Sequence, residues 1–67
     1  MDTEEKICTA FQKHFNGVEV PVMDIPRIYA AVETKYVKTG ESIDNIVSDL
    51  AYQYKMMNEM QEAARCL

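Results

Sequence analysis

The chain has 67 residues, with 7 Lys and Arg against 11 Asp and Glu, and its formal net charge is −4. A chain of this length forms one small domain whose core supplies only about 3–5 kcal/mol, so we expect a partner or a cross-link to add stability. The acidic balance argues against direct nucleic-acid binding, which requires neutralised phosphates, and no apolar stretch approaches the roughly 18 residues of a membrane span.

The two cysteines, Cys8 and Cys66, lie near opposite ends of the chain. Residues 1–10 carry charges and no apolar run, so they do not resemble a secretory signal peptide. We therefore expect a cytoplasmic protein with two free thiols. A terminal disulfide or an intermolecular bridge is the alternative.

Residues 3–15 are predicted to form the first helix. Asp2 and Glu5 have the spacing of a capping box, and Asn16-Gly17 suits the left-handed end of a helix. Its apolar positions are Ile7, Phe11 and Phe15, assisted by Cys8 and Ala10.

Residues 17–23 alternate valine with Glu19 and Pro21. One strand cannot make a sheet, and Pro21 lacks a backbone donor. We expect an extended connector that lays Val18, Val20 and Val22 on the core. The alternative is an edge strand that pairs with another chain.

Residues 25–38 are predicted to form the second helix, with Asp24 as its cap, Pro26 in its first turn and Gly40 after its end. Its apolar face consists of Ile25, Ile28, Tyr29, Val32 and Tyr36.

Residues 42–66 are predicted to form the third helix, with Ser42 as its cap. At about 37 Å it is roughly twice as long as either other helix. Its main apolar seam is Ile43, Val47, Leu50, Tyr54, Met57 and Ala64. A second stripe lies about 100° round the helix. Apart from Ile46, the first half of this stripe is largely polar. Its second half is apolar and consists of Met56, Met60, Ala63 and Leu67. Either the first two helices lie end to end along the third, or a second chain covers its distal half.

The expected fold is all-α, a single helical domain over residues 1–67 with two short helices packed on a long third one. We expect a homodimer through the distal half of the third helix. The predicted interface is Leu50, Tyr54, Met56, Met57, Met60, Ala63, Ala64 and Leu67. The predicted charged rim is Asp49, Glu59 and Glu62. Tyr52 lies off the main seam and is either a rim residue or simply an exposed ring. The methionines suit a dimer core or an adaptable site for a different protein, and one patch can serve both.

Signatures of catalysis are scarce in this sequence. Two glycines cannot build a phosphate-binding loop, and a zinc site would have to recruit Cys8, His14 and Cys66 from scattered positions. On one helix Cys8 and His14 are turned about 240° apart, which separates a thiol from its potential base. We therefore expect no catalytic residue, no cofactor and no metal.

Lys35 and Lys38 flank Tyr36 and form a small basic patch, to which Lys13 and His14 can add. No basic recognition helix is present, so direct nucleic-acid binding is not expected. The function expected from the sequence is that of a non-enzymatic adaptor or regulator that binds itself and another, possibly basic, protein. The alternatives are an acidic decoy that blocks a nucleic-acid-binding protein or nuclease, and a structural subunit of a larger assembly.

Overall fold

The computed structural model describes residues 2–65. These residues form three α-helices and one short 3₁₀ turn, in the order α1 (Thr3–His14), η1 (Val22–Asp24), α2 (Ile25–Thr39) and α3 (Ile43–Arg65), and no strand occurs among them. The three helices pack compactly, which confirms the predicted all-α class.

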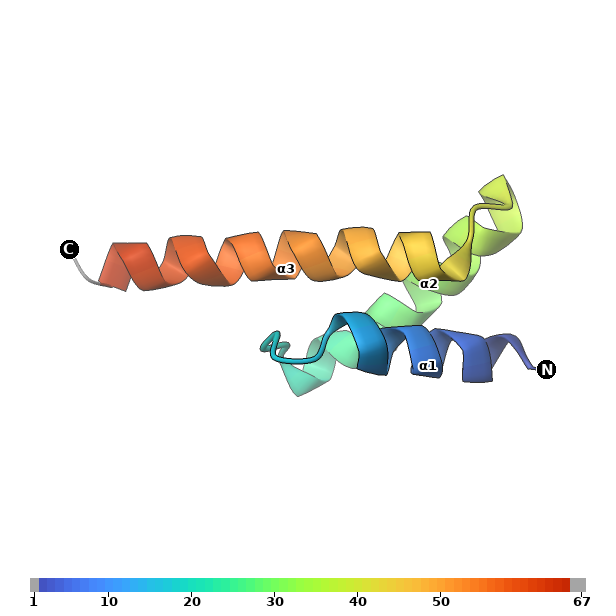
Figure 1. Ribbon diagram of the computed structural model, residues 1–67, viewed down its shortest axis with the longest axis horizontal. Helices are drawn as coiled ribbons and strands as arrows, with labels where there is room; N and C mark the ends of the chain where they lie inside the picture. Colours follow the sequence, from blue (N-terminus) through green and yellow to red (C-terminus); the bar gives the residue numbers. More distant parts are fainter. Residues whose placement is uncertain (1, 66–67) are drawn as a thin grey trace.

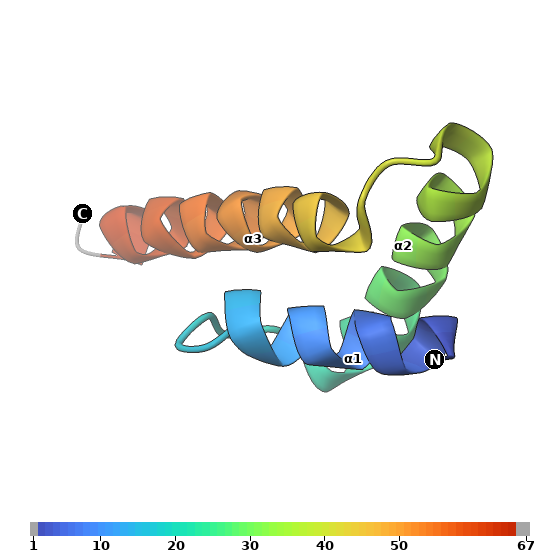
Figure 2. The ribbon, with the colours of Figure 1, turned by 45° about the vertical axis from the view of Figure 1, so that its right-hand side comes forward.

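α1 and α3 lie side by side and run in the same direction, while α2 crosses behind them and leads back to the start of α3 (Figure 1). The turned view shows α2 running from the side of α1 to the start of α3 at one end of the molecule (Figure 2). The molecule measures 46 × 19 × 19 Å, and its long axis follows α3. The distal half of α3 therefore extends beyond the end of α1.

The core lies where the three helices meet. Ile7, Val32 and Val47 are its most completely buried large side chains, one from each helix. The other buried apolar residues are Ala10, Phe15, Ile28, Ile43, Ile46 and Ala51. On α3 this core ends at Ala51, so the proximal half of the helix supplies the buried surface.

The helix ends follow the predicted boundaries, but two predicted side-chain caps do not form. Asp2 and Asp24 occupy the N-cap positions of α1 and α2, and neither side chain caps the helix by a hydrogen bond. The capping box expected from Asp2 and Glu5 is therefore wrong in this respect. Gly40 ends α2 in the left-handed conformation, with φ of 70°, and Ser42 Oγ accepts from the N–H of Asn45 at 3.4 Å.

The connector between α1 and α2 follows the prediction only in its first part. Val18 and Val20 pack against the core, but Val22 is 80% exposed, so its predicted burial is wrong. The reason is that the backbone turns at Pro21, whose carbonyl accepts from the N–H of Asp24 at 2.9 Å. This 3₁₀ turn ends the alternation that an extended chain would have continued.

Both short helices pack on the proximal half of α3, so they do not lie end to end along it (Figure 1). The connector reaches further, because the side-chain amide of Asn58 donates to the carbonyl of Glu19 at 3.0 Å. Beyond Asn58, every α3 residue up to Ala64 is exposed. From 59 to 64, α3 therefore lacks cover from the described part of the chain.

Candidate protein-interaction face

A row of apolar side chains lies exposed on the distal half of α3. Tyr52 is 64% exposed, Met56 41% and Met60 70%, and Ala63 is also exposed. Their spacing of four, four and three residues places them on one side of the helix. We call these four residues the methionine face. Met57, which is 49% exposed, lies about 100° round the helix from the centre of this face, in line with Leu50 and Tyr54.

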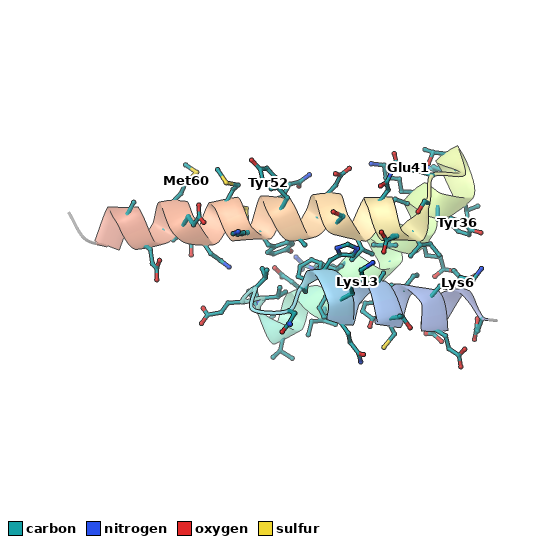
Figure 3. All side chains as sticks on the ribbon, viewed as in Figure 1. Lys6, Lys13, Tyr36, Glu41, Tyr52 and Met60 are labelled. Atoms are coloured by element: carbon teal, nitrogen blue, oxygen red, sulfur yellow. The ribbon has the colours of Figure 1, made fainter. Side chains whose placement is uncertain are left out.

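The methionine face points away from the chain's own core. At about 100° per residue, its centre lies roughly 150° round the helix from the centre of the core-facing side chains of α3. Those core-facing residues are Ile43, Ile46, Val47, Leu50, Ala51 and Tyr54. Tyr52 and Met60 accordingly project from the side of α3 opposite α1 (Figure 3). No rearrangement of side chains alone can bring this face against α1 or α2.

The predicted interface residues divide into two groups in the structure. Leu50 and Tyr54 are partly buried against the chain's own core. The five exposed members are Met56, Met57, Met60, Ala63 and Ala64, and the three rim residues Asp49, Glu59 and Glu62 are exposed as well. Leu67 and Cys66 lie outside the described residues. Tyr52 extends the exposed group, and its position four residues before Met56 was the sequence signal for this.

Tyr54 attaches the middle of α3 to the rest of the fold. Its hydroxyl donates to Asp24 Oδ2 at 3.1 Å, and its ring meets that of Phe15 edge-on with centroids 5.9 Å apart. Burial and the hydrogen bond to the Asp24 carboxylate raise the pKa of the Tyr54 hydroxyl. This residue fixes the point from which the exposed part of α3 projects.

An open groove of about 360 Å³ lies between α3 and the connector. Glu19, Glu59 and Glu62 line it together with Lys55, so the lining carries three acidic side chains and one basic side chain. The groove lies beside the hydrogen bond between Asn58 and Glu19. Glu59 and Glu62 of α3 and Glu19 of the connector thus form one acidic border along the distal helix, and Asp49 lies apart from it.

The predicted basic patch is largely engaged in ion pairs. His14 Nε2 lies 2.9 Å from Asp44 Oδ1, and Lys13 Nζ lies 3.6 Å from the same oxygen. Lys35 Nζ lies 3.6 Å from Glu41 Oε2. The hydrogen bond from His14 lowers the pKa of Asp44, with the positive charge nearby acting in the same direction. Lys13, His14 and Lys35 therefore each lie beside a carboxylate of the same chain.

A second groove, of about 450 Å³, separates α1 from the start of α3. Its lining includes Lys6, Lys13 and Tyr36, whose positions Figure 3 labels. Ala10 and Ile43 contribute apolar surface to the same lining. Because Lys13 already pairs with Asp44 in the same lining, the groove presents a mixed charge rather than a basic surface.

The groups considered for catalysis are separated in the fold. Cys8 is a partly buried free thiol whose sulfur accepts from the amide of Gln12 at 3.7 Å, whereas His14 faces Asp44. Within residues 2–65, no cluster of three or more His, Cys, Asp or Glu side chains is arranged to hold a metal ion. None of the described helices combines the length and apolar character needed to cross a membrane.

Comparison of the chain with models of known protein families, with curated proteins and with solved structures gives no match.

Proposed function

We propose that this protein is a non-enzymatic adaptor or regulator that binds protein chains through the methionine face and assembles as a homodimer. The observation that carries this proposal is the exposure of Tyr52, Met56 and Met60 on the side of α3 opposite the core. A contiguous apolar row of this kind on a small domain is typical of an interaction surface. Methionine suits it because its unbranched thioether chain adapts to varied partners.

The free energy available from burying the exposed apolar side chains predicts a reversible complex. Weighted by their exposed fractions, Tyr52, Met56 and Met60 of two chains contribute on the order of 7 kcal/mol when buried. Association costs roughly 4–15 kcal/mol in lost translational and rotational freedom. The two magnitudes are similar, so we expect a dimer whose population depends on concentration in the micromolar range or above.

Acidic side chains give this surface a preference among partners. Asp49, Glu59 and Glu62 are exposed beside the methionine face and would attract a basic protein during encounter. By occupying such a partner or joining it to a second one, the chain would act by occlusion or bridging.

The three glutamates around the groove favour one further candidate function. An acidic inhibitor that occupies the nucleic-acid site of a basic protein would use this border rather than the apolar row. Its binding would weaken steeply as salt rises, because exposed charges are screened within about 10 Å at 0.1 M salt.

The test is the solution mass of the native chain and of two variants by light scattering over concentration and salt. Met60→Glu places a charge in the proposed interface and should shift the dimer to monomer, with unchanged helical content. Met23→Glu makes the same exchange on η1, where the side chain is 81% exposed, and should leave the mass unchanged. Equal masses for the native chain and Met60→Glu at every concentration would contradict self-assembly through this face.

A further inference from the structure

The methionine face is graded in size along its length, and this grading bears on how a second copy would lie against it. The large ring of Tyr52 lies at the proximal end, Met56 and Met60 lie in the middle, and the small Ala63 lies at the distal end. Two copies in parallel would set each residue level with its own counterpart. That arrangement crowds two tyrosine rings and leaves a gap between two alanines.

We infer that the occupant of the methionine face is a second copy of this chain, with its α3 antiparallel to the first. This inference rests on the proposed function and deepens it. When Met56 of one copy lies level with Met60 of the other, Tyr52 lies within about 1.5 Å along the axis of the partner's Ala63. Large and small residues then alternate across the interface, so the row can close without crowding or gaps.

The same register also brings opposite charges together along one edge of the face. Lys55 of each copy lies about 3 Å along the axis from Glu59 of the other, on the same edge of the pair. With Glu62 included, the charges along that edge run glutamate, lysine, glutamate, glutamate, lysine, glutamate, and each lysine lies between Glu59 and Glu62 of the other copy. Lys55 and Glu59 are exposed and have no ion-pair partner among the described residues. Each lysine therefore supplies the countercharge for the two glutamates that the pairing brings together.

Steric access agrees with this arrangement. α1 and α2 pack on the opposite side of α3, and the register overlaps the two helices only over about 51–65. The two bodies of packed helices then lie at opposite ends of the dimer. Antiparallel neighbours also set each helix dipole against the opposite end of the other.

Spin-label distances distinguish the two orientations. In a background with Cys8→Ser and Cys66→Ser, one variant carries the label at Asp49→Cys and another at Gln61→Cys. The antiparallel register separates the two copies of position 49 by about 27 Å along the axis and those of position 61 by about 9 Å. A parallel pair has no axial offset at either position. A short distance at position 49, which lies on the same side of α3 as the methionine face, would overturn the inference while leaving the proposed dimer intact, whereas the absence of a dimer would overturn both.

Mixing two variants tests the pairing of large with small residues. Tyr52→Ala leaves alanine facing alanine, and Ala63→Tyr sets tyrosine against tyrosine, so each homodimer should weaken by about tenfold or more. An equimolar mixture restores one tyrosine and one alanine at both contacts and should regain native affinity. Both positions are exposed, so urea unfolding of the monomers should not change. Failure of the mixture to recover would contradict the pairing of Tyr52 with Ala63.

Discussion

Replacing Tyr54 by phenylalanine separates the role of this residue in the fold from any role at an interface. The substitution removes the hydroxyl that donates to Asp24 Oδ2 at 3.1 Å and keeps the ring that packs on Phe15. A hydrogen bond of this kind contributes about 1 kcal/mol net, and somewhat more when its acceptor is charged. In a domain whose total stability is about 3–5 kcal/mol, such a loss is readily measured.

The pH dependence of Tyr54→Phe gives the sharper test. Burial and the bond to Asp24 raise the folded-state pKa of Tyr54 above its ordinary value of 10.0. The folded protein therefore holds this proton more tightly than the unfolded chain does. The resulting stability is fully present below pH 10 and is lost as pH rises through the folded pKa. Ionisation also removes the donor and sets a phenolate beside the Asp24 carboxylate.

The assay is urea unfolding followed by circular dichroism, at neutral pH and again above pH 10. We expect the native chain to exceed Tyr54→Phe in stability at neutral pH and this difference to shrink at alkaline pH. Tyr29, whose pKa is also raised by burial and by its hydrogen bond with Cys8, is present in both proteins, so its effect cancels in the comparison. A constant difference across this range, or none at neutral pH, would refute the assigned role of the hydroxyl.

Three further changes probe the fold. Val47→Ala, at a fully buried position, should cost about 2–3 kcal/mol and lower the urea midpoint by roughly 2 M. In Gly40→Ala the added Cβ has no neighbour within 4 Å. The expected loss of about 1–2 kcal/mol in stability should therefore come from the φ of 70° alone, and thermal unfolding would measure it. Asp44→Asn replaces the titrating carboxylate of the His14 bond by a neutral amide. Because that bond lowers the pKa of Asp44 from its ordinary 3.8, its stabilisation is present above about pH 4 and lost as pH falls through the folded pKa. Acid titrations of the two proteins should therefore converge.

The prolines and glycines at the ends of the predicted helices were sufficient to place those helices in the sequence. Pro26 suits only the first turn of a helix, and Gly40 supplies the left-handed conformation that ends one, so the predicted boundaries lie close to those observed. The side-chain caps were less predictable. Asp24 stands at the expected position, but its carboxylate accepts from Tyr54, thirty residues along the chain. A capping pattern describes a local preference, and a distant donor can take the same oxygen.

The methionine face was likewise predictable from the sequence only in part. The spacing of Met56 and Met60 indicated a second apolar stripe on the distal helix, and both are exposed there. Spacing cannot say which stripe the rest of the chain will cover. Leu50 and Tyr54 share a seam with Met57, yet they pack on the core because α1 and the connector end beside them.

The sequence by itself determined the helical class, the approximate ends of the three helices and the amphipathic character of α3, because these depend on neighbours within a few residues. Only the tertiary structure decided that α1 and α2 would share the proximal half of α3, that Val22 would turn outward, and that Tyr52 would join the exposed row. These outcomes depend on contacts between distant segments, and many distributions of the same apolar residues satisfy the same periodicity. The position of the candidate site therefore follows from where the other helices end.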